Sequence, residues 1–160
     1  MPKLVIVSIP RCGRNFIANE LKKQNIHTEY QCQKTIDQLD NTADIIFAHD
    51  FNLDYYDPSR YLLRLNRNTN ECLRSWFLLD VRQNRAANTK KAWLKRKKIL
   101  SKYIYEFDTK YKYVDTVWFH NILEHPNTVL AMICSIIGKP WTPVEYTKHV
   151  QRDLNIWPFV

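Results

Sequence analysis

The 160-residue sequence predicts an α/β protein with three layers, in which a central parallel β-sheet is flanked by helices. Three observations predict this class. Short runs of β-branched and aliphatic residues recur without polar alternation, as in strands that are buried on both faces. Segments with helical periodicity separate these runs. The hydrophobic content of 45% and the aromatic content of 13% are enough for a packed core. We therefore expect a single domain over residues 1–160.

Four strands are expected, and each is a short apolar run that ends at a polar or turn residue. The first follows almost directly from the first residue, and the others recur at intervals along the chain. They span residues 3–9, 43–48, 60–65 and 113–119. Four or more parallel strands bring their carboxyl ends to one edge of the sheet, where ligands of such sheets bind.

The helices are expected from apolar residues at helical spacing between the strands. The first begins near Phe16, after a loop over residues 10–15, and the others span residues 70–81, 88–107 and 127–137. Gly138 provides the stop signal of the last helix. The helix over 88–107 belongs to a basic helical insertion, which we place at residues 82–107.

The net charge of +8 is concentrated in this insertion. Nine basic residues and no acidic residue lie between Arg82 and Lys102, so the remainder of the chain is nearly neutral. An anionic partner would explain the segment, and a solvated helix face is the structural alternative.

No feature of the chain indicates a membrane or a metal. No apolar run approaches the ~18 residues of a membrane span, and the amino terminus lacks the pattern of a signal peptide. The four cysteines, Cys12, Cys32, Cys72 and Cys134, are too far apart for a zinc motif. We expect a cytoplasmic protein with free thiols, without a bound metal and without membrane contact.

The loop after the first strand has the features of an anion site. It joins a buried strand to a helix, where backbone amides and the positive end of the helix dipole favour an anion. Gly13 permits close approach of an anion, and Arg11 and Arg14 add positive charge. The spacing G-x-x-x-x-G-K-[ST] of ATP- and GTP-binding loops is absent.

The segment IVSIPRCGRNFI, residues 6–17, resembles the 5′-phosphosulfate loop of sulfotransferases that use PAPS (3′-phosphoadenosine-5′-phosphosulfate), whose usual form is P-[KR]-[ST]-G-[ST]-[ST]. Pro10, Arg11 and Gly13 match this form. The resemblance implies the P-loop-like sulfotransferase fold, with Arg11 acting on the transferred group. It also implies a cradle of backbone amides for the 5′-phosphate, from Cys12, Gly13, Arg14 and Asn15. Three of these positions, Cys12, Arg14 and Asn15, depart from the family's hydroxyl residues.

The segment YLLRLNRNTNECLRSWF, residues 61–77, resembles the family's site for the 3′-phosphate. The resemblance implies that Arg67 and Ser75 hold this phosphate, since a guanidinium fork and a hydroxyl donor suit a dianion. The structural alternative is a solvated arginine and a serine that merely fills a helix position.

The segment IIFAHDF, residues 45–51, ends an expected strand with His49. Sulfotransferases carry their catalytic base at a corresponding strand end, so the resemblance implies that His49 takes the proton of the acceptor. Asp50 is the alternative base. A structural histidine is the other interpretation.

The late segment over residues 114–138 is similar to the family's last strand and helix. Its acidic residues are replaced by His120 and Asn121, while Phe119 could still pack against adenine. The family's late cofactor loop is missing, and the candidates to replace it are Lys148 and Arg152 together, or the basic helix.

The sequence therefore predicts a PAPS-dependent sulfotransferase whose product is PAP, the adenosine 3′,5′-bisphosphate, and which needs no metal. The acceptor and the oligomeric state stay open, with an anionic carbohydrate or a small molecule as candidate acceptors. One alternative is a non-catalytic module that binds a nucleotide or an acidic glycan. The other is a basic nucleic-acid-binding protein that uses the basic helix with Trp93 and Tyr103. It is the weaker alternative, because no nucleic-acid-binding motif is present.

Overall fold

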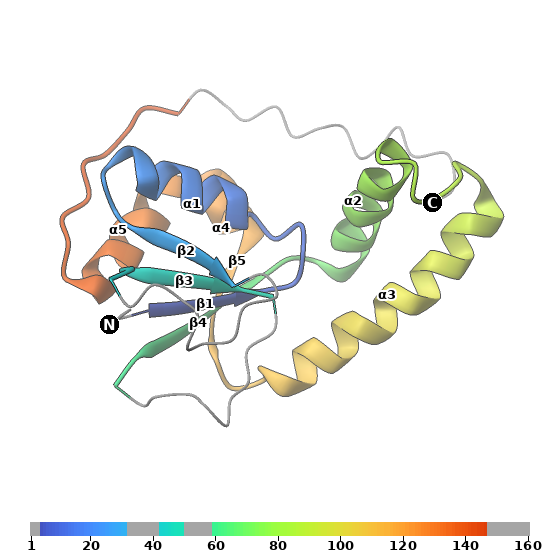
Figure 1. The fold of residues 1–160 in the computed structure, drawn as a ribbon, viewed down its shortest axis with the longest axis horizontal. Coiled ribbons are helices and arrows are strands. Elements are labelled where there is room, and N and C mark those ends of the chain that lie inside the picture. The colour runs from blue at the N-terminus through green and yellow to red at the C-terminus, as the bar shows by residue number, and fades with distance from the viewer. Residues whose placement is uncertain (1–3, 32–41, 50–58, 147–160) are drawn as a thin grey trace. The chain divides into compact units, whose positions relative to one another are not determined.

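A computed structural model describes residues 4–31, 42–49 and 59–146 (Figure 1). The chain divides into two compact units. The first unit joins Met1–Asn66 to Tyr113–Glu145, and the second joins Arg67–Lys112 to Tyr146–Val160. The described part of the first unit contains every strand, and that of the second contains two helices. The single domain expected over 1–160 stays a prediction.

The first unit is built on a five-stranded sheet in the order β2-β3-β1-β4-β5, and every neighbouring pair is parallel. This confirms the expected α/β class with a parallel sheet flanked by helices. The strands are β1 (Leu4–Ser8), β2 (Thr28–Gln31), β3 (Ile45–Ala48), β4 (Tyr61–Asn66) and β5 (Asp115–Trp118).

β1 lies at the centre of the sheet because its sequence tolerates burial on both faces. All five residues of LVIVS are buried, as are all four residues of the neighbouring β3. The chain leaves β1 toward β2 and β3 and later crosses to β4 on the other side of β1. This reversal makes the carboxyl end of β1 the point where a ligand crevice forms in sheets of this kind.

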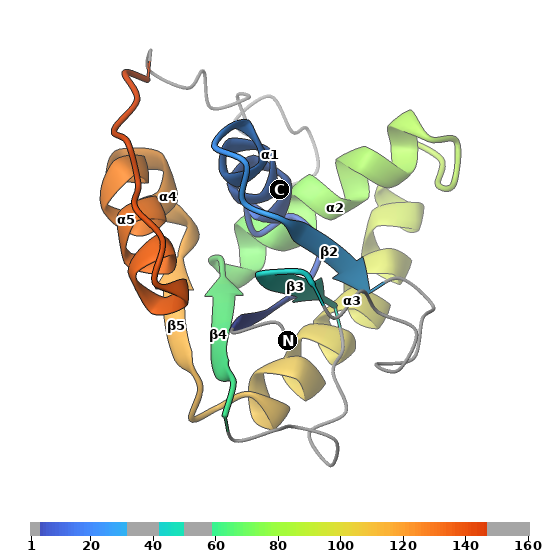
Figure 2. The ribbon, with the colours of Figure 1, turned by 60° about the vertical axis from the view of Figure 1, so that its left-hand side comes forward.

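Three helices of the first unit lie on one side of the sheet in both views (Figures 1 and 2). They are α1 (Arg14–Lys23), α4 (Phe119–Glu124) and α5 (Pro126–Ile137). Ile17 and Leu21 of α1 are fully buried. Gly138 ends α5 at a φ of 71°, which is the left-handed conformation expected from its C-terminal stop signal.

The described part of the second unit contains two helices, α2 (Thr69–Arg82) and α3 (Lys90–Lys110). The two helices pack through aromatic contacts. The rings of Phe77 and Trp93 lie 5.3 Å apart, and those of Trp76 and Tyr103 lie 5.7 Å apart. In the described ranges, no helix is both long enough and apolar enough to cross a membrane.

Candidate functional site

The loop after β1 has an unusual backbone. Arg11 has a φ of 71° and Gly13 a φ of 92°, so two residues of one short loop adopt the left-handed conformation. This conformation costs a non-glycine residue energy, and such positions concentrate at functional sites. Alternation of this kind can point successive backbone amides toward one place, as in anion-binding loops.

Gly13 is required for a reason that the sequence did not reveal. A Cβ atom at this position would lie 3.0 Å from Cδ1 of Ile122 and 3.2 Å from Cδ2 of Phe119. The side of Gly13 on which a Cβ atom would lie therefore faces α4. An anion cannot approach Gly13 from that side. Phe119, predicted to contact adenine, is half-buried at this packing contact.

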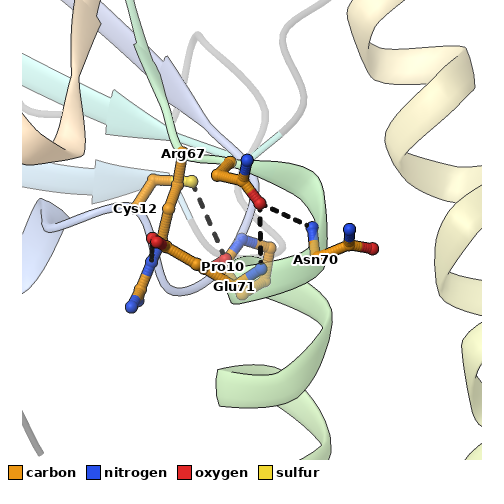
Figure 3. Close-up of polar contacts among 6 residues, drawn as sticks. Pro10, Cys12, Arg67, Asn70 and Glu71 are labelled. Carbon is orange, nitrogen blue, oxygen red and sulfur yellow. Dashed lines mark hydrogen bonds and ion pairs between the residues drawn. The ribbon is translucent and has the colours of Figure 1, made fainter. Parts of the chain in front are cut away.

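The amino end of α1 differs from the amino ends of α2 and α3. Gly13 caps α1 without a side-chain hydrogen bond, and the first turn contains no acidic residue. In contrast, Oδ1 of Asn68 accepts hydrogen bonds from the amides of Asn70 and Glu71 at the start of α2 (Figure 3). At the start of α3, Oγ1 of Thr89 likewise accepts a hydrogen bond from the amide of Ala92. The start of α1 thus keeps the electrostatic character of an anion site.

The side chains of Cys12, Arg14 and Asn15 make contacts within the protein and do not replace the hydroxyl groups of the sulfotransferase loop. Cys12 is fully buried, with its thiol 4.0 Å from the carbonyl oxygen of Pro10 (Figure 3). The guanidinium of Arg14 lies 3.8 Å above the ring of Tyr30 and donates a hydrogen bond to Asn15. At Cys12, Arg14 and Asn15, an anion would therefore be held by backbone amides.

His49 follows β3 and lies opposite the end of β1. The register pairs Ala48 with Val7, so the next residue along β3 comes beside Ser8. The imidazole Nδ1 is 2.8 Å from the carbonyl oxygen of Ser8. The ring of Tyr30 meets the imidazole edge to face, with ring centroids 5.3 Å apart.

Burial lowers the pKa of His49 below its ordinary value, and the positive charge of Arg14 acts in the same direction. The hydrogen bond to the Ser8 carbonyl opposes this shift but does not reverse it. The imidazole is therefore neutral at pH 7, as a general base must be. Asp50, the alternative base, lies outside the described residues.

Ser8 also carries a buried polar atom beside this histidine. Its side chain is fully buried, and within the described residues its hydroxyl oxygen has no hydrogen-bond partner. A buried hydroxyl without a partner is costly, and it is a common mark of a position that a bound molecule or water completes.

Arg67 and Ser75 belong to the second unit. Both are buried, with exposed fractions of 8% and 7%. The Nε of Arg67 lies 3.5 Å from a carboxylate oxygen of Glu71, which is long for a charge-assisted hydrogen bond (Figure 3). The side chain of Glu71 is 42% exposed, so it is a weak partner for this arginine.

An open pocket of about 170 Å³ lies between α1 and β2 in the first unit. Its lining includes Arg14, Asn19, Lys22, Glu29 and Tyr30. Ligand pockets usually hold 300–1,000 Å³ by a rough guide, so this pocket is too small for a whole nucleotide.

Part of the basic segment is explained by a buried acid of α2, a pairing that the sequence does not predict. Asp80 of α2 is fully buried. Its Oδ1 lies 3.0 Å from Nη2 of Arg85, and its Oδ2 lies 2.7 Å from Nε of Arg96. The contact with Arg96 is a hydrogen bond, whereas the contact with Arg85 is an ion pair without hydrogen-bond geometry. Asp80 thus gives two of the nine basic residues a buried partner.

The aromatic residues proposed for nucleic-acid binding are not available. Trp93 is 5% exposed and packs on Phe77, and Tyr103 is half-buried against Trp76. Neither ring can serve as an open stacking surface. Across the described ranges, no three His, Cys, Asp or Glu side chains gather into a metal-binding group.

Comparison with known proteins gives the fold. The structure is similar to the crystal structure of a sulfotransferase from Alicyclobacillus acidocaldarius, with a TM-score of 0.57 and 14% sequence identity. The match covers 96% of this chain and 88% of the other. No protein-family model matches the sequence, and no curated protein matches it either. The chain therefore has the sulfotransferase fold, as the motifs of its sequence indicated.

Proposed function

We propose that this chain binds PAPS and transfers its sulfuryl group to a hydroxyl or amine of an acceptor. One observation carries the proposal: the contact between His49 and Ser8. It holds the imidazole at the carboxyl edge of the sheet, and burial favours the neutral form of this imidazole. From this same edge, β1 continues into the loop and into the amino end of α1, which has no side-chain cap.

The first unit would hold the 5′-phosphosulfate. The start of α1 suits a phosphate because it has no side-chain cap, has no acid in its first turn and follows two left-handed residues. The amides from Cys12 to Asn15 would bind the 5′-phosphate. Arg11 would stabilise the charge that develops on the bridging oxygen during transfer.

The second unit would hold the 3′-phosphate through Arg67 and Ser75. The guanidinium offers a planar set of donors, and the serine adds a hydroxyl donor. The long contact with the half-exposed Glu71 supports this role, because a phosphate dianion would compete well with such a carboxylate.

The transfer itself needs only groups that the chain and its two substrates supply. Nε2 of His49 takes the proton of the acceptor while the acceptor oxygen or nitrogen bonds to sulfur. The bond between sulfur and the bridging oxygen breaks, and PAP leaves with the electron pair. Burial keeps His49 neutral and ready for this step at pH 7.

Two measurements on wild type and His49→Ala test this proposal. One follows transfer of labelled sulfate from PAPS to a broad panel of hydroxyl and amine acceptors, and the other measures PAP binding. We expect the variant to keep PAP binding and to lose transfer by about 10²–10⁴-fold. Tight PAP binding by the wild type without transfer to any acceptor would favour the non-catalytic module.

A further inference from the structure

α3 carries an exposed row of residues that the proposed function does not use. Lys91, Lys95, Lys98, Lys102 and Tyr105 follow one another at alternating spacings of four and three residues. This spacing places them on one stripe along a helix. We call these five residues the α3 stripe. With a rise of 1.5 Å per residue, the stripe is about 21 Å long.

The stripe is exposed, and its charge has little internal compensation. All five residues are exposed, and Tyr105 has an exposed fraction of 72%. Within the described residues, Glu106 is the one acidic side chain at ion-pair distance from the stripe, 4.0 Å from Lys102. The sequence contains no acid from Lys90 to Lys102. The stripe is therefore a line of positive charge that ends in an exposed aromatic ring.

The four lysines of the stripe differ in role from the arginines of the same basic segment. Arg85 and Arg96, which belong to the same basic segment, pair with the buried Asp80 and stabilise the helix pair. The buried side of α3 is formed by Trp93, Leu100, Ile104 and Phe107. The stripe lysines serve neither purpose, so they are neither core residues nor partners of Asp80.

We infer that the α3 stripe binds single-stranded nucleic acid through its phosphate backbone. Lysines are point charges that attract phosphates without reading the sequence of bases. Proteins that bind single strands combine such a basic track with aromatic side chains on which bases stack. Tyr105 supplies this ring at the end of the lysine row, in place of the buried Trp93 and the half-buried Tyr103. The inference does not depend on the proposed function.

Two other polyanions fit the stripe less well. A helix that lies on a membrane surface needs a continuous apolar face. The exposed face of α3 is charged along its centre, and the exposed Leu94 and Ile99 lie on opposite sides of the α3 stripe. An acidic glycan would satisfy the lysines but has no planar base for Tyr105. The exposed tyrosine is thus the feature that favours a nucleic acid.

The test measures binding of a fluorescent oligothymidylate to the full chain as salt is raised from about 50 to about 200 mM. Four lysine–phosphate contacts predict a slope of log affinity against log salt of about −3. The variant K95Q/K98Q/K102Q should bind more weakly and have a slope shallower by about 2. The matched control K23Q/K110Q/K112Q loses the same charge from exposed lysines outside the stripe and should keep the wild-type slope.

Tyr105 separates a nucleic acid from other polyanions. Tyr105→Ala should weaken oligothymidylate binding roughly tenfold, and Tyr105→Phe should retain it. Tyr113→Ala, a change at another exposed tyrosine outside α3, should have no effect. Melting temperatures of all variants verify that they are folded.

Three outcomes would overturn the inference. The first is the absence of oligothymidylate binding by the wild type at low salt. The second is equal weakening in the stripe variant and the matched control, which would indicate net charge alone. The third is equally tight binding of a heparin fragment or of anionic vesicles, with no dependence of oligothymidylate binding on Tyr105.

Discussion

The imidazole Nδ1 of His49 lies 2.8 Å from the carbonyl oxygen of Ser8, so the ends of β3 and β1 are joined by a side-chain contact. A carbonyl oxygen can only accept a hydrogen bond, and therefore Nδ1 carries the proton. Nε2 is then the nitrogen with the free electron pair. The contact thus selects both the tautomer and the direction from which His49 can accept a proton.

The tautomer and the pKa of His49 can be measured without an acceptor. Nitrogen-15 NMR should show the neutral form with its proton on Nδ1, and a titration midpoint below the ordinary value of about 6.5. A His49→Gln variant identifies the signal. A proton on Nε2 would contradict the role of the Ser8 carbonyl in selecting the tautomer, and a midpoint above 6.5 would contradict the effect of burial.

The stability of the protein should depend on pH through the same residue. The folded-state pKa of His49 is lower than that of the unfolded chain, so below about pH 6.5 the unfolded state binds more protons. The wild type should therefore lose stability relative to His49→Gln as the pH falls from about 7 to about 5. Urea unfolding of both proteins at the two pH values measures this. An unchanged difference in stability would show that burial does not disfavour the imidazolium.

Gly13→Ala should be more destabilising than the same change at Gly138. Both glycines have a positive φ, which costs alanine about 1–2 kcal/mol, and among the described residues it is at Gly13 that the new Cβ would also meet side chains, at 3.0–3.2 Å. We expect a loss of about 2–4 kcal/mol at Gly13. Adding Ile122→Val removes the closest atom and should recover part of the loss. Equal losses at the two glycines, measured by urea unfolding, would exclude the contact with α4.

Arg96→Ala should destabilise the chain more than Arg85→Ala. Asp80 is fully buried, and Arg96 is the partner that makes a hydrogen bond with it. Its removal leaves a buried carboxylate poorly compensated, at a cost of about 3 kcal/mol. The contact with the more exposed Arg85 should contribute less than about 1 kcal/mol. The order of the two unfolding free energies tests this, and the reverse order would contradict it.

The buried strands were predictable because burial on both faces leaves a clear pattern. The apolar runs of β1, β3 and β4 were found within one or two residues of their observed ends. β2 was not predicted, since TEYQ is short, polar and at the edge of the sheet. The contacts of Tyr30, in β2, with Arg14 and His49 were missed for the same reason, and no sequence signal indicates them. α4 was not predicted either, because its six residues lie between a strand and Pro126 and are too few to give a helical pattern.

The position of His49 at the end of a strand was predictable from the order of the strands. His49 comes beside Ser8 because parallel register places the ends of β3 and β1 together, and the sequence alone indicated the position of this histidine. The partner of Gly13 in α4 depends on chain segments about 100 residues apart. The pairing of Asp80 with Arg96 depends on the packing of α2 against α3. Such contacts are set by tertiary packing and leave no local pattern.

The most direct test of the proposed function compares the melting-temperature shifts caused by PAP, AMP and ATP. A chain that holds both ends of the donor should be stabilised most by PAP, because AMP and ATP lack the 3′-phosphate. Arg67→Gln should reduce the PAP shift to the level of AMP. Equal shifts with PAP and AMP in the wild type, or an undiminished PAP shift in Arg67→Gln, would contradict the proposal that this chain recognises the 3′-phosphate of PAPS.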